Sequence, residues 1–268
     1  MKANVYSLDG NKIEEIELPL VFETPYRPDL IHKAFIHVQS TTFQPQGRDP
    51  LAGERTSAES RNTGQGIARM ARIKGSGFPR AGQAAGVGNV VKGRLAHPPT
   101  SEKIIIKRIN KKEKALALAS AIAATSKKEL VTKRGHLYDN ELPLVISDDI
   151  EKIKKAKDLL NILKILKIDK DLERVKERIK RRSGKSRMRG RSKRVGKSVL
   201  IVVKDPTNIS KAAGSIPGID VTSLSRLSII DLAPGSHAGR LTLWSRSAIE
   251  GLDERVKAPL LDLMRVIA

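Results

Sequence analysis

The stretch from Thr41 to Thr100 constrains the fold more than any other part of the sequence. It holds ten of the chain's twenty glycines and shows neither helical nor alternating apolar periodicity. Nine Lys or Arg residues and three acids give it a net charge of +6. A structureless segment of this length is improbable inside a compact domain, so it is either disordered or shaped by a partner. Scattered apolar residues such as Phe43, Ile67 and Val90 favour a partner, because disordered tails usually lack such anchors.

The positive charge is concentrated in two places. The 268 residues carry a formal net charge of +22. Beside the +6 of residues 41–100, the block from Arg178 to Lys197 holds eleven Lys or Arg and no acid. Nucleic acid and an anionic membrane surface are the two partners that such a distribution suggests. Because no apolar run is long enough to span a bilayer and the N-terminus has no signal-peptide pattern, we expect a nucleic-acid partner and no membrane.

The rest of the chain alternates predicted strands and helices. Strands are expected on either side of a turn within Ala3 to Leu18, at Leu142 to Ile146, and at Val199 to Val203, whose unbroken apolar run is typical of a strand covered on both faces. Apolar residues at helical spacing predict four helices: one starting at Pro28, then Lys111 to Thr125, Ile150 to Leu163 capped near Ser147, and Asp171 to Lys180. This alternation predicts an α/β fold with a mainly parallel sheet flanked by helices and a long extended loop inserted near the N-terminus.

Turn signals divide the C-terminal part into short apolar runs. Pro217-Gly218 and Pro234-Gly235 separate the runs Ile219 to Val221, Leu227 to Leu232 and Leu241 to Trp244. Trp244 is expected in the core. A last helix is predicted to begin near Ser245 or Ser247, and the tail from Val256 to Ala268 is helical in pattern.

Motifs for catalysis are weak. Gly184-Lys185-Ser186 and Gly196-Lys197-Ser198 resemble the end of a phosphate-binding loop, but the required earlier glycine is missing in both. The five histidines show no metal-ligand spacing, so we expect them at the surface or in loops and expect no metal site and no cofactor. The absence of cysteine excludes disulfides and thiolate metal sites and is compatible with a cytoplasmic protein.

The cationic side chains are the candidate binding residues. Glycines between them allow the backbone to approach a sugar-phosphate surface closely, and Arg offers bidentate geometry to phosphate. Phe43 and Phe78 are candidates to stack on unpaired bases or, equally, to anchor the loop. The predicted phosphate contacts are Arg48, Arg55, Arg61, Arg69, Arg72, Lys74, Arg80, Lys92, Arg94, Arg181, Arg182, Lys185, Arg187, Arg189, Arg191, Lys193 and Arg194.

Several short motifs stand out along the chain: Thr56-Ser57-Ala58-Glu59-Ser60, Thr63-Gly64 with Ala68-Arg69 to Arg72, Gly75-Ser76-Gly77, Arg80-Ala81-Gly82-Gln83, Glu141 to Ile146, and Leu232 to Gly235 with His237-Ala238-Gly239-Arg240. Together they resemble the motifs of the large-subunit ribosomal protein L-four family in its archaeal and eukaryotic form. The resemblance covers nearly the whole chain. It implies an α/β domain on the outside of the large subunit and a loop that threads through ribosomal RNA to the wall of the peptide exit tunnel.

The resemblance also implies partners and a tunnel-facing tip. The partners are large-subunit ribosomal RNA, neighbouring proteins including ribosomal protein L-twenty-two opposite the tip, and the nascent polypeptide. The implied tip residues are Arg61, Asn62, Thr63, Gly64, Gln65, Gly66, Ile67, Arg69, Met70 and Arg72. The implied organisation is an α/β globular domain at 1–40 and 101–268, an extended RNA-penetrating loop at 41–100 and a basic rRNA-binding segment at 178–197.

We therefore expect a non-enzymatic structural constituent of the cytoplasmic large ribosomal subunit that binds 23S-type ribosomal RNA. Two alternatives remain open at this stage. A regulator that binds double-stranded nucleic acid would bind isolated duplexes with sequence selectivity. A nucleotide-dependent enzyme would need the phosphate-binding loop that the sequence lacks.

Overall fold

The computed structural model describes residues 1–256. The helix predicted from Val256 to Ala268 therefore lies outside the described residues, except for Val256 itself. By its internal contacts the chain divides into two compact units. The first unit comprises Met1–Ser40 and the chain from Lys107 on, and the second unit comprises Thr41–Ile106.

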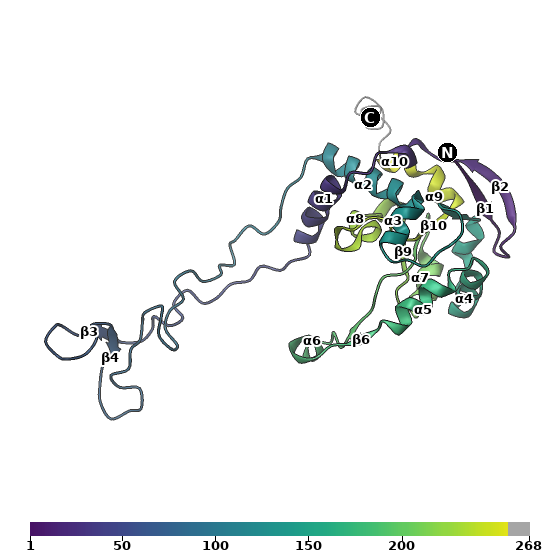
Figure 1. Ribbon diagram of the computed structural model, residues 1–268. Coiled ribbons are helices and arrows are strands. Elements are labelled where there is room, and N and C mark those ends of the chain that lie inside the picture. Colours follow the sequence, from purple (N-terminus) through teal and green to yellow (C-terminus); the bar gives the residue numbers. More distant parts are fainter. Residues whose placement is uncertain (257–268) are drawn as a thin grey trace. The chain divides into compact units, whose positions relative to one another are not determined.

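A six-stranded sheet forms the centre of the first unit (Figure 1). The order of its strands is β2-β1-β5-β10-β8-β9. β1 and β2 pair antiparallel, and the other four pairings are parallel. This confirms the predicted α/β fold with a mainly parallel sheet. The strands are β1 (Lys2–Tyr6), β2 (Lys12–Glu17), β5 (Leu144–Ile146), β8 (Leu200–Val203), β9 (Asp220–Ser223) and β10 (Thr242–Ser245).

Side chains of the parallel strands alternate between two hydrophobic cores. Leu200 and Val202 of β8 pack into one core, whereas Ile201 and Val203 pack into the other. Trp244 of β10 belongs to the first core and is fully buried, as predicted. Because successive residues of a strand point to opposite faces, a strand with a core on each face must be apolar throughout.

Helices cover both faces of the sheet. Residues of α1, α2, α8, α9 and α10 contribute to the core around Trp244, and residues of α4, α5 and α7 contribute to the opposite core. Helices therefore cover both faces of the sheet, as the α/β prediction requires. The helices of this unit are α1 (Pro28–Ser40), α2 (Lys111–Ser126), α3 (Lys128–Lys133), α4 (Ala156–Ile165), α5 (Asp169–Glu177), α6 (Gly184–Met188), α7 (Thr207–Ala213), α8 (Ile229–Leu232), α9 (Arg246–Glu250) and α10 (Leu252–Val256).

The alanine-rich helix α2 is buried on several sides, and not only along one apolar stripe. All nine residues from Ala117 to Thr125 are buried. Small side chains allow neighbouring segments to approach closely on several sides, and α2 packs against α1, α8 and the 3₁₀ helix η1 (Leu20–Glu23). The predicted helix is confirmed, but its burial comes from its small residues and not from one apolar face.

Three segments differ from the prediction or refine it. After β5 the chain forms a 3₁₀ helix, η2 (Asp148–Lys152), and α4 begins only at Ala156, so the predicted continuous helix from Ile150 is wrong. Ser147 makes no side-chain capping hydrogen bond. The helix predicted to reach Lys180 ends at Glu177, and the run Leu227 to Leu232 forms the short helix α8 because Ser228 and Asp231 complete a capping box.

The second unit contains no α-helix among its residues. Its two ends run beside each other, since the Arg48 backbone N–H donates to the Pro99 carbonyl oxygen at 3.0 Å. An antiparallel hairpin of β3 (Ala58–Ser60) and β4 (Ala71–Ile73), labelled in Figure 1, lies between them. Three-residue strands are too short to show periodicity, which is why the sequence did not predict them.

Candidate nucleic-acid interface

The basic block folds into a small antiparallel ribbon. β6 (Lys180–Arg181) pairs with β7 (Lys193–Arg194), and the short helix α6 lies between them. Beyond the strands the Arg182 backbone N–H donates to the Ser192 carbonyl oxygen at 2.8 Å. We call residues 180–194 the basic ribbon. This backbone pairing holds closely spaced cations on a two-stranded scaffold, which the sequence analysis did not predict.

The basic ribbon presents its cations to solvent. Seven of the eight predicted residues on it are exposed, and Arg182 is half-buried. Within residues 1–256, none of the eight forms an ion pair with an acid. Cations that repel one another without a counter-charge are stabilised by polyanions, and Arg binds phosphate bidentately. The eight residues are Arg181, Arg182, Lys185, Arg187, Arg189, Arg191, Lys193 and Arg194.

Three of the nine predicted cations of the second unit have intramolecular partners. Arg55 pairs with Asp49, with 2.7 Å between Nη1 and Oδ2, and Lys74 pairs with Glu59. Arg72 is half-buried and donates from Nη1 to the Gly82 carbonyl oxygen at 2.9 Å. The other six have neither an ion pair nor a side-chain hydrogen bond among the described residues, and all are exposed: Arg48, Arg61, Arg69, Arg80, Lys92 and Arg94.

The segment predicted as the tip is the loop of the β3–β4 hairpin. Residues 61–69 are exposed, and Met70 and Arg72 are half-buried. Gly64 has a φ of 87° and Gly66 a φ of 68°, a left-handed conformation that glycine adopts without strain. The Ser60 hydroxyl closes the base of the loop by donating to the Arg69 carbonyl oxygen. The loop is therefore a defined turn whose cations at Arg61 and Arg69 face solvent.

The two candidate stacking residues are exposed. Phe43 is 54% and Phe78 is 43% exposed. Neither is buried within the second unit, and the interpretation that they anchor the loop stays a prediction. Their role in stacking on bases stays a prediction.

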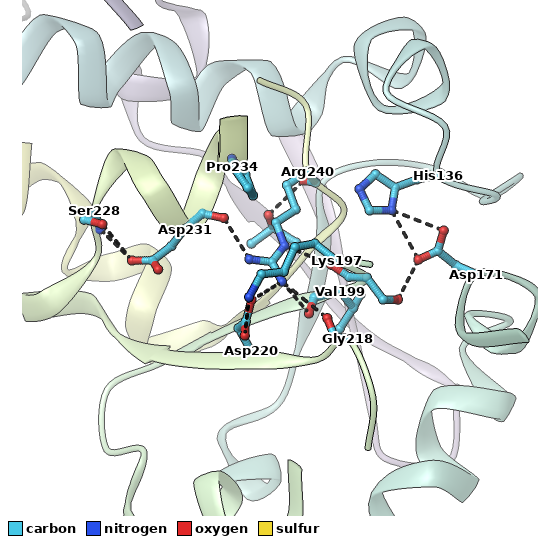
Figure 2. A network of polar contacts seen from close by, with 12 residues as sticks. His136, Asp171, Lys197, Val199, Gly218, Asp220, Ser228, Asp231, Pro234 and Arg240 are labelled. Carbon is cyan, nitrogen blue, oxygen red and sulfur yellow. Dashed lines mark hydrogen bonds and ion pairs between the residues drawn. The ribbon is translucent and has the colours of Figure 1, made fainter. Parts of the chain in front are cut away.

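A buried arginine, Arg240, joins the amino ends of three strands (Figure 2). Its Nη2 donates to an Asp220 carboxylate oxygen at 2.6 Å at the start of β9. Its Nε donates to the Ser198 carbonyl oxygen at 2.8 Å, just before β8, and its Nη1 to the Asp231 carbonyl oxygen at 2.9 Å. Lys197 also binds Asp220 at 2.8 Å. Burial lowers the pKa of Arg240 against the opposing attraction of Asp220.

A second buried group, His136, was not expected. His136 lies in the loop after α3, as predicted for the histidines, but it is only 3% exposed and so is not a surface residue. Its Nδ1 lies 3.2 Å from the carboxylate of the fully buried Asp171 (Figure 2). Burial lowers the pKa of His136, so the neutral ring donates to Asp171. Burial alone would raise the pKa of Asp171, but hydrogen bonds from His136 and Arg174 hold it well below its usual range.

These buried groups do not form a catalytic triad. The Ser198 hydroxyl donates to Asp171 at 2.6 Å, and His136 contacts the same carboxylate. A nucleophilic serine needs a hydrogen bond to the histidine that accepts its proton. Here both residues bind the acid and not each other, so Ser198 has no hydrogen bond to the histidine that would accept its proton. In the described part of the chain, no group of three or more His, Cys, Asp or Glu could hold a metal ion, and no helix is long and apolar enough to cross a membrane.

The first unit thus has an α/β core, and exposed cations without an ion pair among residues 1–256 lie both on the basic ribbon and in the second unit. The family whose model matches the chain is the Ribosomal protein L4/L1 family, over residues 16–255. The chain belongs to this family.

Curated relatives match along nearly their whole length. The large ribosomal subunit protein uL4 of Methanocaldococcus jannaschii is 48% identical over 256 residues, which cover 95% of this chain and 99% of the relative. The protein of the same name from Sulfurisphaera tokodaii is 46% identical over 261 residues, which cover 97% of this chain and 96% of the relative. That of Methanococcus aeolicus is 47% identical and is covered completely.

The structure brings together some predicted residues and adds others. The eight predicted cations on the basic ribbon share one short hairpin, and the predicted cations of the second unit are spread along that unit. Sequence reasoning missed the buried residues His136, Asp171 and Asp220. Arg240 appeared only within the family motif His237 to Arg240. No local pattern marks a buried ion pair, because its partners come from distant elements.

Proposed function

We propose that this chain is a structural constituent of the large ribosomal subunit that binds 23S-type ribosomal RNA. The observation that carries the proposal is the near-complete match to relatives named large ribosomal subunit protein uL4. The unpaired cations of the basic ribbon supply the chemistry. They neutralise phosphates where RNA helices pack, and Arg fixes register on the backbone without reading sequence.

The second unit is proposed to be the extended loop that penetrates the RNA. Its α-helix-free backbone, its ten glycines and the six predicted cations that are exposed without an ion pair among the described residues support this role. A surface rich in glycine allows close approach to sugar and phosphate. In this proposal residues 41–100 thread the RNA, residues 1–40 and 101–268 form the globular domain, and residues 178–197 bind rRNA beside it.

The β3–β4 loop is proposed to line the constriction of the polypeptide exit tunnel. Its partners there are the nascent polypeptide and ribosomal protein L-twenty-two. The support is the family membership together with the solvent-facing loop that carries Arg61 and Arg69. The proposed location is the cytoplasmic ribosome, and the proposed role requires no enzymatic activity and no cofactor.

Co-sedimentation tests the proposal directly. Large subunits are isolated from cells that express the tagged chain and are washed in high salt before they are pelleted. We expect the chain to remain with the large subunit in about one copy per particle. Salt displaces a protein that is bound only by charge at the surface, but it does not displace one whose loop is enclosed by folded RNA. Loss of the chain in the wash, or its recovery on isolated duplexes of one sequence, would favour the double-stranded regulator instead.

A further inference from the structure

A cavity of about 700 Å³ opens on the first unit beside the segments that lead into β8 and β10. Its cationic side chains come from α3 and the turn after it, from α5, from the basic ribbon and from the residues just after the ribbon. We call this cavity the arginine pocket and define it by Lys133, Arg134, Arg174, Arg194 and Lys197. None of the described residues that line it is an Asp or Glu. The pocket therefore concentrates positive charge in a partly open cavity.

Two of the five cations are already neutralised from outside the pocket. Arg174 donates from Nε to Asp171 at 2.9 Å, and Lys197 pairs with Asp220 at 2.8 Å. Lys133, Arg134 and Arg194 form no ion pair with an acid within residues 1–256. Three positive charges in the pocket thus lack a counter-charge.

Arg134 is the most constrained of the three. Its Nη2 donates to the Pro234 carbonyl oxygen at 2.9 Å, while its Nη1 is buried without a hydrogen-bond partner. Burial, together with the charges of Arg240 and Arg174, lowers the pKa of Arg134 to about 10. A buried charged donor without a partner is costly, so this guanidinium is held ready for an anion.

We infer that the arginine pocket binds a phosphate group. The planar guanidinium matches two phosphate oxygens, and three uncompensated cations match the charge that a phosphate brings. The inference rests on the proposed function for the source of this phosphate. The source is a phosphodiester of ribosomal RNA that is distinct from those bound by the rest of the basic ribbon and by the second unit. A free phosphate ion is the other source of the same chemistry.

The first experiment measures the midpoint of thermal unfolding, Tm, of the full chain with inorganic phosphate, against sodium chloride at equal ionic strength. We expect phosphate at ten times its Kd to raise the Tm by about 3 °C. Arg134→Gln should abolish this rise without lowering the Tm in chloride, since the substitution removes an unpaired buried charge. Arg194→Gln, at an exposed position, should reduce the rise, and the matched control R181Q/R187Q on the basic ribbon should keep it. An equal loss in the control would overturn the inference.

The second experiment measures the affinity of the same variants for large-subunit ribosomal RNA. We expect R134Q/R194Q to bind about tenfold more weakly than the wild type and to lower the slope of log K against log salt by about 0.7 to 0.9, which is the change for one lost phosphate contact. The control K157Q/K164Q removes the same charge from α4 and should bind as the wild type does.

The outcomes separate the two proposals. A phosphate response that depends on Arg134, with unchanged RNA affinity, supports the pocket but overturns RNA as the source of the phosphate. If the variants keep both the phosphate response and the affinity for ribosomal RNA, the phosphate-binding pocket is overturned, even if the wild type binds ribosomal RNA. A wild type that fails to bind ribosomal RNA but keeps the Arg134-dependent phosphate response refutes the proposed function and leaves the pocket standing.

Discussion

The Arg240 guanidinium donates to the Asp220 carboxylate at 2.6 Å, and the arginine side chain is 1% exposed. This pair lies where β8, β9 and β10 begin, and the same guanidinium binds the carbonyl oxygens of Ser198 and Asp231. The Arg240 side chain thereby donates hydrogen bonds to backbone carbonyl groups of two segments and pairs with the carboxylate of a third. The parallel strands consequently share a fixed amino-terminal edge next to the arginine pocket.

Replacing Arg240 with Met should destabilise the fold. The substitution leaves the partly buried Asp220 with Lys197 alone and removes the donors of two buried carbonyl groups, so we expect the free energy of unfolding to fall by about 3 kcal/mol. Urea denaturation of the free protein measures this. Arg246→Met is the matched control, because Arg246 is half-exposed and its ion pairs with Glu14 and Glu250 are worth about 1 kcal/mol or less. Equal losses in the two variants would contradict the structural role of Arg240.

The buried His136 and Asp171 should make stability fall as the pH is lowered. The pKa of His136 is below its ordinary value of 6.5, so the unfolded chain takes up a proton first, and stability declines as the pH falls below about 6.5. The pKa of Asp171 is also lowered from 3.8, so a second loss follows as the pH falls below about 4. Free energies of unfolding between pH 7 and pH 3 measure both steps. His136→Gln should flatten the first step, and the exposed-site control His32→Gln should keep it. A first step that survives His136→Gln would assign it to another group.

The basic ribbon should set the salt dependence of RNA binding. Replacing Arg181, Arg182, Arg187 and Arg189 with Gln removes up to four phosphate contacts, which should weaken binding to ribosomal RNA and lower the slope of log K against log salt by about 3. Filter binding over a range of potassium chloride concentrations measures the slope. An unchanged slope would mean that the ribbon does not face phosphate. The control replaces four exposed lysines near or on α4, namely Lys154, Lys155, Lys157 and Lys164, and should leave the slope unchanged.

Deleting Gly64 to Met70 should alter the tunnel but not assembly. The deletion leaves Arg61, Asn62 and Thr63 between the β3 and β4 strands, which is a normal length for a hairpin loop, and it touches neither core. We expect large subunits to assemble, while stalling on an arrest peptide and the protection of RNA bases by a drug bound in the upper tunnel both change.

Ribosomes with the full loop are the reference for this deletion. A matched control replaces Gln65 and Ile67 with Ser at full loop length, and it separates the loss of length from the loss of particular side chains. Normal assembly with both readouts unaltered in the deletion would place the β3–β4 loop away from the lumen.

The predicted helices and strands that the structure confirmed are those whose local sequence pattern is compatible with one kind of element only. The unbroken apolar run at β8 predicted a strand with a core on both faces. Pro28, followed by apolar residues at helical spacing, predicted the residue at which α1 begins. Where the local signal was ambiguous, prediction failed. The spacing from Ile150 to Leu163 suited one helix, yet the chain forms η2 first and starts α4 at Ala156.

The sequence by itself determined the α/β class, the family and the two concentrations of positive charge, because periodicity, motifs and net charge are properties of consecutive residues. Tertiary structure alone decided which charges are buried and paired. His136 meets Asp171 across 35 positions and Arg240 meets Asp220 across 20, and the exposed Arg181 differs from the buried Arg240 only in its surroundings. Burial changes both the free energy and the pKa of a charge, and it depends on residues that come together only when the chain folds.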